Sequence, residues 1–215
     1  MKTIRRLALM GGLLMACTGI QAQDDTSGSS FSGNIGFLSD YVFRGIFQAE
    51  SSANGGLDWE SGGFYAGTWA ADVGIGAEVD LYLGYGGEIE DFSYSIGATG
   101  YYYTDDFDDT YQELNLNAGY GFFGFSANFG QYDNFDGSTQ DYSFYSITAE
   151  GAGFYGTIGS FGQDFDGEYY EAGYGTEVAG IDLGLSAIYS DEMLAGGTSG
   201  ETTVVFSIGK TFTIR

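Results

Sequence analysis

The connections between the strand-like segments of this chain are sorted by length, and that sorting restricts the fold more than any other feature of the sequence. About twelve segments carry a strand pattern, and every second connection is short and glycine-rich, at 61–63, 86–87, 119–121, 151–153 and 178–180. The intervening connections are mostly longer and acidic, at 105–109, 133–141, 164–168 and 191–201. Tight turns at one end and longer loops at the other are typical of a bacterial outer-membrane barrel, whereas a soluble sandwich has no reason to sort its loops in this way.

Side chains of alternating polarity within these segments indicate strands with one apolar and one polar face. In the segment 77–85 one face carries Val79, Leu81, Leu83 and Tyr85, and the other carries Glu78, Asp80, Tyr82 and Gly84. The chain holds 38 glycines, 18 tyrosines, 18 phenylalanines and no proline, a residue that cannot donate to a strand ladder. We therefore predict an all-β fold, a single antiparallel up-and-down transmembrane β-barrel of about 12 strands that covers residues 31–215.

The first residues read as a targeting segment rather than as part of the fold. Three basic residues come first, Lys2, Arg5 and Arg6. The apolar stretch 7–16 that follows them is too short to span a bilayer, as in a secretory signal peptide. We predict a signal peptide at 1–22 that is cleaved after Ala22, and a flexible lead-in at 23–30. A lipoprotein signal at Cys17 is the alternative.

The charge of the mature chain restricts its partners. Cleavage after Ala22 leaves three basic residues against thirty acidic ones, a net charge of −27, and no cysteine. Nucleic acid and anionic membrane surfaces are poor partners for such a chain, because binding them requires clustered Lys or Arg. A chain without cysteine has no disulfide or thiol chemistry. High charge alone would suggest disorder, but 43% of the residues are hydrophobic, which argues against it.

The segment Ser39–Ile46, with the sequence SDYVFRGI, is the most distinctive motif of the chain. Together with the stretches 63–70, 78–85 and 207–212, it resembles the TorF-type family of outer-membrane porins of Gram-negative bacteria. The resemblance spans most of the mature chain and implies a barrel in the cell outer membrane more firmly than it implies a substrate. Phe47 departs from the pattern, which leads us to expect a small hydroxyl residue there.

The C-terminal strand carries the second implication of this resemblance. Outer-membrane proteins are normally recognised by the barrel-assembly machinery through a terminal strand that ends in an aromatic residue. The similarity to these proteins implies that Phe212 is the assembly signal and that the assembly machinery is a partner. The chain departs from the pattern here as well, because residues 213–215 extend beyond Phe212.

Arg44 is one of the three basic side chains that remain after the leader is removed. Its segment alternates, with Asp40 and Arg44 on the polar parity and Ile35, Phe37, Tyr41 and Phe43 on the apolar parity. We predict that Arg44 faces the lumen with a set of carboxylates, Asp40, Asp58, Asp80, Glu113 and Asp182. Residues four apart on a strand are about 13 Å apart, so Asp58 or Asp80 on a neighbouring strand is the expected partner of Arg44. Two interpretations remain open, a charged ring that restricts a pore and a structural salt bridge that fills a narrow lumen.

The longer connections carry nine acidic residues that we expect at one rim of the barrel, Asp105, Asp106, Asp108, Asp109, Asp133, Asp136, Asp164, Asp166 and Glu168. Their summed negative potential would concentrate cations at the entrance. A calcium loop is the alternative, but glycines stand at its first and twelfth ligand positions, Gly162 and Gly173. We therefore predict a solvated acidic rim and no metal site.

The sequence contains few residues that indicate catalysis or cofactor binding. The chain has no histidine, the commonest general base and metal ligand. The glycine pattern at 119–124 matches a dinucleotide fingerprint, but an alternating strand follows it where a helix is required. We predict no enzyme and no cofactor.

The function that follows is a channel for small hydrophilic solutes or ions with a weak preference for cations. Its partners would be outer-membrane lipid, the barrel-assembly machinery, and small solutes or cations. The sequence sets no oligomeric state. Two alternatives stay open: a non-conducting structural or surface-binding barrel that works through its acidic loops, and a secreted β-protein rich in glycine and tyrosine.

Overall fold

The computed structural model describes residues 28–214. The predicted signal peptide, its cleavage after Ala22 and the alternative at Cys17 lie outside the described residues. Twelve β-strands and no helix make up the secondary structure of the part that is described. Accordingly, these residues contain no helix with the length and apolar character to cross a membrane. The first strand starts at Ser30, one residue before the predicted start of the barrel.

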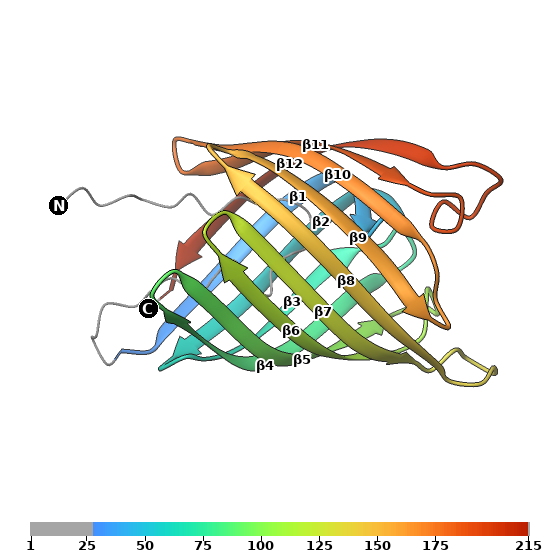
Figure 1. The fold of residues 1–215 in the computed structure, drawn as a ribbon, viewed down its shortest axis with the longest axis horizontal. Coiled ribbons are helices and arrows are strands. Elements are labelled where there is room, and N and C mark those ends of the chain that lie inside the picture. The colour runs from blue at the N-terminus through green and yellow to red at the C-terminus, as the bar shows by residue number, and fades with distance from the viewer. Residues whose placement is uncertain (1–27, 215) are drawn as a thin grey trace.

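The twelve strands form one closed barrel (Figure 1). Their bounds are β1 Ser30–Phe43, β2 Ile46–Ser61, β3 Phe64–Asp72, β4 Ala77–Ile89, β5 Phe92–Tyr103, β6 Tyr111–Tyr120, β7 Phe123–Tyr132, β8 Gln140–Gly151, β9 Phe154–Gln163, β10 Glu168–Val178, β11 Ile181–Ser190 and β12 Glu201–Thr213. Each strand pairs antiparallel with its neighbours in the chain, and β1 pairs with β12 to close the ring. The prediction of a single antiparallel barrel of about 12 strands is confirmed.

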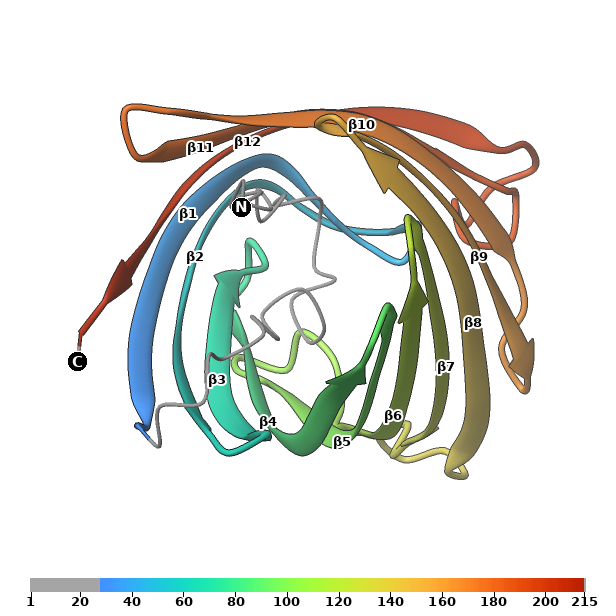
Figure 2. The same ribbon diagram turned by 60° about the vertical axis from the view of Figure 1, so that its left-hand side comes forward.

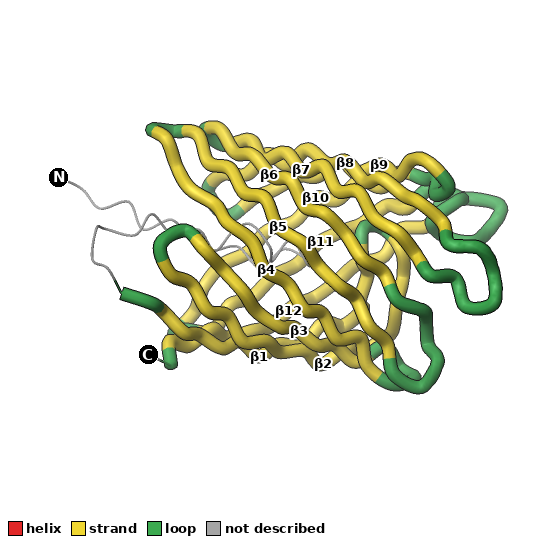
Figure 3. Tube along the Cα trace, turned by 90° about the horizontal axis from the view of Figure 1, so that it is seen from below, coloured by secondary structure: helices red, strands yellow, loops and turns green. Residues whose placement is uncertain are grey.

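The two ends of the barrel differ in their connections, as Figure 3 shows. The end at which β1 begins and β12 stops, here called the turn end, carries two-residue turns at 62–63, 90–91, 121–122, 152–153 and 179–180. The opposite end, here called the loop end, carries connections at 44–45, 73–76, 104–110, 133–139, 164–167 and 191–200. Apart from the tight turn at 44–45, the sequence predicts this division of short and long connections.

One predicted turn is wrong. Gly86 and Gly87 lie inside β4 and pair with Ser95 and Tyr94 of β5. A Cβ atom on Gly87 would lie 3.0 Å from the hydroxyl oxygen of Tyr94, so the absence of a side chain there leaves room for the tyrosine. The chain instead reverses after Glu90, whose φ of 57° is in the left-handed region.

Apolar side chains cover the outside of the barrel and polar side chains line much of its inside. On β4, Leu81 and Leu83 are exposed, whereas Glu78 and Asp80 are buried. Asn115 of β6 is also buried in the interior. The alternation that we predict for β4 is therefore the observed one, because a strand in the wall meets a different environment on each face.

The half of the β1–β2 hairpin that lies nearer its turn at 44–45 leaves the wall and bends across the lumen. β1 pairs with β12 only as far as Leu38, and β2 begins to pair with β3 only at Asn54. Between these points the two strands pair with each other, with a bulge at Tyr41/Val42. In Figure 2 the tip of this hairpin lies inside the ring formed by the other strands. We call residues 39–53 the inner hairpin.

Candidate functional site

The tip of the inner hairpin packs against the wall on the far side of the lumen. Val42 belongs to a buried cluster with inward-facing residues of β8 to β12, and Ile46 packs against that cluster. Its wall members are Tyr142, Phe144, Phe161, Tyr169, Ile188 and Val205. At the turn, Ser190 of β11 donates a hydrogen bond of 2.5 Å from its Oγ to the carbonyl oxygen of Gly45. The hairpin is therefore docked and does not hang freely in the lumen.

Glycine suits the turn at position 45 for two reasons. Its φ of 83° lies in the left-handed region, which residues with a side chain adopt rarely. A Cβ atom there would also lie 2.6 Å from the Cβ atom of Tyr169 on β10. The backbone of the tip thus approaches β10 so closely that any other residue type at position 45 requires the tip to shift.

Arg44 forms a bidentate ion pair with Glu113 on β6, across the lumen from β1. Its Nη1 and Nη2 atoms donate to Oε2 and Oε1 of Glu113 at 2.6 and 2.9 Å. The Arg44 side chain is 13% exposed and that of Glu113 is 0% exposed. Burial alone would lower the pKa of Arg44, but attraction to the Glu113 carboxylate outweighs it, and the pKa lies above its ordinary value. The two-fold hydrogen bonding makes this the strong form of an ion pair.

Aromatic and amide groups complete the surroundings of the ion pair. Tyr142 of β8 donates to Oε2 of Glu113 at 3.0 Å, and Asn115 of β6 donates to Oε1 at 2.5 Å. The Arg44 guanidinium lies 4.3 Å from the ring centre of Phe144 and 4.8 Å from that of Phe43, within the range of a cation–π interaction. At this level side chains of the hairpin and of the wall are therefore in contact across the lumen.

The other face of the inner hairpin packs on β3, β4 and β5. Tyr41, which is 1% exposed, donates from its hydroxyl to Oε1 of Glu78 at 2.7 Å. Its ring meets that of Trp69 edge to face, with ring centres 5.8 Å apart. Phe43 packs similarly on Tyr101 at 5.7 Å. Tyr41 and Phe43, which the alternation assigns to the apolar parity, therefore pack on aromatic side chains inside the barrel, because the hairpin has left the wall.

The structure brings together only some of the predicted lumen residues. The partner of Arg44 is Glu113 and not Asp58 or Asp80, because the hairpin carries Arg44 past the neighbouring strands to β6. Asp80 lies close enough to Glu78, Glu113 and Arg44 to interact electrostatically with all three. Asp80 thus belongs to the same charge cluster.

The other three predicted lumen residues lie apart from the ion pair. Asp58 accepts hydrogen bonds from Tyr82 of β4 and from Asn34 of β1. Asp182 is the second residue of β11, next to the turn end, and pairs in register with Glu177. Asp40 accepts a bond of 3.1 Å from Ser39, at the point where β1 leaves the wall.

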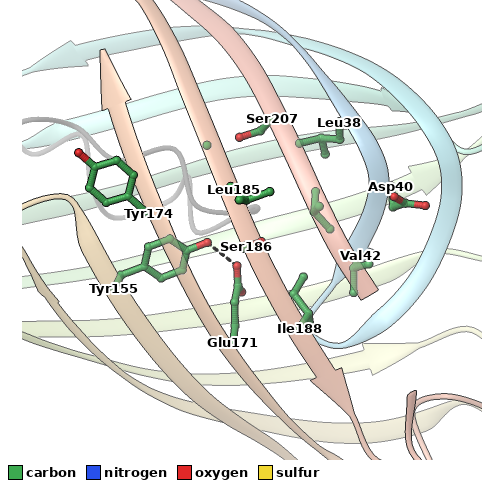
Figure 4. A pocket seen from close by; sticks show the side chains of 12 residues that line it. Leu38, Asp40, Val42, Tyr155, Glu171, Tyr174, Leu185, Ser186, Ile188 and Ser207 are labelled. Atoms are coloured by element: carbon green, nitrogen blue, oxygen red, sulfur yellow. Dashed lines mark hydrogen bonds between the residues drawn. The ribbon is translucent and has the colours of Figure 1, made fainter. Parts of the chain in front are cut away.

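A small pocket lies between the bend of β1 and strands β9 to β12 (Figure 4). Its polar edge includes Asp40 and the pair Tyr155–Glu171, in which the tyrosine hydroxyl donates to the carboxylate at 2.5 Å. The rest of its lining comes from β1 and β9 to β12, namely Leu38, Val42, Tyr174, Gly184, Leu185, Ser186, Ile188, Val205 and Ser207. This pocket lies beside the inner hairpin, between the hairpin and β12.

The nine predicted rim residues all lie at the loop end. Asp105, Asp106, Asp133, Asp136, Asp164, Asp166 and Glu168 are exposed. Asp108 accepts hydrogen bonds from Tyr111 and Tyr132 at 2.9 and 2.8 Å, and Asp109 accepts one from the backbone N–H of Phe135. These two carboxylates therefore hold the loops together. Across residues 28–214, no group of three or more His, Cys, Asp or Glu side chains is placed to hold a metal ion.

Several residues of the site are not among the sequence-predicted ones, namely Tyr41, Glu78, Tyr101, Tyr142 and Phe144. A signal for two of them is present in β8, whose inward positions carry Tyr142 and Phe144 while Tyr145 and Ile147 face outward. A barrel strand that is aromatic on both faces has something apolar to pack against inside. That pattern could have indicated an occupant of the lumen.

Together the fold and the site define a closed antiparallel β-barrel with a polar, acidic lumen that its own first hairpin crosses. Comparison with known sequences then places the chain in a family. The chain belongs to the Gcw_chp family, described as bacterial proteins of unknown function, whose sequence model matches residues 22–187. A search of curated proteins finds no match to the chain.

Solved structures of low sequence identity share the fold. A membrane protein solved in work on in-meso crystallization has 9% identity and a TM-score of 0.59, with 86% of this chain and 84% of that chain covered. The NanC porin has 11% identity and a TM-score of 0.50, with 85% of this chain and 98% of that chain covered. OccK1 (OpdK) of Pseudomonas aeruginosa has 10% identity and a TM-score of 0.44, with 88% and 67% covered, and that score is too low to carry an argument. These likenesses concern the fold alone.

Proposed function

We propose that this protein is an outer-membrane channel for small hydrophilic solutes or ions, with a weak preference for cations, and that the inner hairpin restricts its lumen. The signal peptide, the insertion by the barrel-assembly machinery and the TorF-type character belong to the same proposal. Its main support is the combination of an apolar exterior with a lumen lined by carboxylates and amides. A polar interior of this kind is what a water-filled channel has.

The packing of the hairpin tip favours a second candidate function. The buried contacts of the tip with β6 and with β8 to β12 suit a non-conducting barrel whose acidic loops form the working surface. The two candidates differ in conductance. Refolded protein in a planar bilayer should pass current if it is a channel, and a correctly folded barrel without any current would favour the surface-binding role.

The exposed part of the acidic rim should set the cation preference. Asp105 and Asp106 are exposed and both have φ near 58°, a conformation that Asn adopts readily. The double variant D105N/D106N should shift the reversal potential in a salt gradient toward non-selectivity at low salt. In molar salt, where the screening length falls to about 3 Å, the same variant should match the wild type.

A charge-preserving variant provides the control for the rim. D105E/D106E keeps both negative charges and should retain the wild-type reversal potential at every salt concentration. Asp108 and Asp109 are left intact because they hold the loops through hydrogen bonds. An unchanged reversal potential of D105N/D106N at low salt would show that this loop does not set selectivity.

Phe212 should act in assembly and contribute little to the folded barrel. Its side chain is exposed on β12 near the turn end, and the chain continues past it, with Ile214 donating its N–H to the carbonyl oxygen of Phe31 at 2.7 Å. We expect Phe212→Ala to lower the amount of barrel that reaches the outer membrane, measured as heat-modifiable protein in membrane fractions. Phe206→Ala, on the same exposed face, is the control. Equal assembly of the two variants would remove the special role of Phe212.

A further inference from the structure

The inner hairpin caps two carboxylates of the wall with its own donors. Arg44 binds both oxygens of Glu113 on β6, and Tyr41 donates to one oxygen of Glu78 on β4. Asp80 of β4 lies beside them and interacts electrostatically with Glu78, Glu113 and Arg44. Over the whole residue, the exposed fractions of Glu78, Asp80 and Glu113 are 1, 5 and 4%. Three wall carboxyl groups and a single guanidinium group thus lie in one buried cluster, in which Arg44 pairs with Glu113 and interacts with Asp80.

The hairpin leaves part of this site unsatisfied. Oε2 of Glu78 and Oδ1 of Asp80 are buried and have no hydrogen-bond partner. A buried acceptor without a donor costs free energy, and a buried charge without a counter-charge costs more. A ligand with N–H donors would satisfy these oxygens, and its positive charge would be attracted to the clustered carboxyl groups.

We propose that Glu78, Asp80 and Glu113 form a binding site for organic cations that carry a guanidinium group, and that Arg44 fills this site in the closed barrel. The inference rests on the proposed channel function and names its substrate class. The contact between Arg44 and Glu113 displays the recognition chemistry, because a planar guanidinium matches the two oxygens of a carboxylate. Phe144, a wall residue, would offer its ring face to a free guanidinium as it does to Arg44.

The attachment of the hairpin allows Arg44 to be displaced. Beyond Leu38 the ladder between β1 and β12 has ended, so the inner hairpin can move without breaking the closure of the barrel. Besides the bonds from Arg44 and Tyr41, three hydrogen bonds tie it to the wall. The N–H of Phe206 donates to Oγ of Ser39, Oγ of Ser52 donates to the carbonyl oxygen of Asp72, and Oγ of Ser190 donates to the carbonyl oxygen of Gly45. A guanidinium solute that enters the lumen would compete with Arg44 for Glu113 and would release the tip.

Tryptophan fluorescence of the refolded mature barrel in detergent micelles tests this competition directly. The chain has two tryptophans, and the variant W59F removes the exposed one and keeps Trp69, which packs on Tyr41. Methylguanidinium is the probe, and tetramethylammonium, which has the same charge but no N–H donor, is the control. In the W59F/R44A background, methylguanidinium should change the Trp69 signal saturably and bind about tenfold more tightly than tetramethylammonium. Adding E113Q should abolish the saturable change.

The wild-type hairpin provides a second measurement in case R44A does not fold. In W59F alone, methylguanidinium should bind more weakly than in R44A, because it must displace Arg44, and it should increase quenching of Trp69 by acrylamide. A lack of saturable binding in both backgrounds would overturn the proposal, as would equal binding with and without E113Q or equal affinity for the two probes. A methylammonium titration that matches methylguanidinium would overturn the guanidinium class.

The binding assay needs no ionic current, so the site and the channel can fail separately. Saturable binding by a barrel that does not conduct would keep the site and reject the channel. Conductance without saturable binding would keep the channel and reject the site.

Discussion

Replacing Arg44 by alanine should increase the single-channel conductance of the refolded barrel several-fold. The side chains of Arg44 and Glu113 are 13% and 0% exposed, so the substitution leaves a buried carboxylate without its counter-charge in the docked state. Loss of one partner of a buried ion pair costs about 3–5 kcal/mol, which corresponds to about two to four powers of ten in the docking equilibrium. Tyr142 and Asn115 still donate hydrogen bonds to Glu113 in the R44A variant, so the free-energy cost should lie toward the lower end of about 3–5 kcal/mol.

Lys210 provides the matched control for this prediction. It is the other basic residue within 28–214, and it is exposed on β12, at a position that pairs with the outward-facing Ile35 of β1. Lys210→Ala removes the same charge without touching the lumen and should leave the conductance at the wild-type level. If R44A and K210A conduct equally, Arg44 does not restrict the lumen.

Replacing Glu113 by alanine should have the largest effect on stability. Glu113 accepts hydrogen bonds from both terminal nitrogens of Arg44, from Asn115, and from the hydroxyls of Tyr101 and Tyr142. Its removal therefore leaves a buried cation and three further donors without this acceptor. We expect the free energy of unfolding in urea, measured on the barrel in micelles, to fall by about 3–5 kcal/mol.

A double-mutant cycle separates the ion pair from the other contacts of Glu113. In the E113A background Arg44 is an unpaired buried charge, and R44A removes it. The free energy of unfolding of R44A/E113A should therefore fall by about 0.5–3 kcal/mol less than the sum of the losses in the two single variants. A second cycle with K210A in place of R44A should be additive, because Lys210 lies on the outer face. Additive losses in the first cycle would mean that the ion pair does not contribute to stability.

The sequence predicts the wall of this barrel well, and the reason is physical. On β4, Leu81 and Leu83 face outward and Glu78 and Asp80 face inward, because the wall separates two environments and strand geometry alternates between them. The arrangement of turns and loops at opposite ends follows from the same up-and-down order. The predicted turn at Gly86–Gly87 fails because a glycine in a barrel strand can also make room for an aromatic ring, here that of Tyr94.

The inner hairpin is the part that alternation cannot predict. Alternation treats every strand as part of the wall, so it restricts Arg44 to partners on adjacent strands. That expectation fails because a hairpin that crosses the lumen buries Tyr41 and brings Arg44 to Glu113, 69 residues away in the chain. Long-range placement of this kind depends on the packing of Val42 and Ile46 against the far wall, which local periodicity does not encode.

A disulfide between the hairpin tip and β10 tests the docked hairpin most directly. A Cβ atom at position 45 would lie 2.6 Å from that of Tyr169, and a disulfide needs about 3.8 Å, so a shift of about 1 Å allows the bond. The folded G45C/Y169C barrel should form the bond on mild oxidation and should then conduct less than after reduction. G45C/L83C, with Leu83 on the outer face, should form no bond within the molecule. If both thiols of folded G45C/Y169C instead react freely with a water-soluble maleimide and no bond forms, the hairpin does not cross the lumen and the account fails.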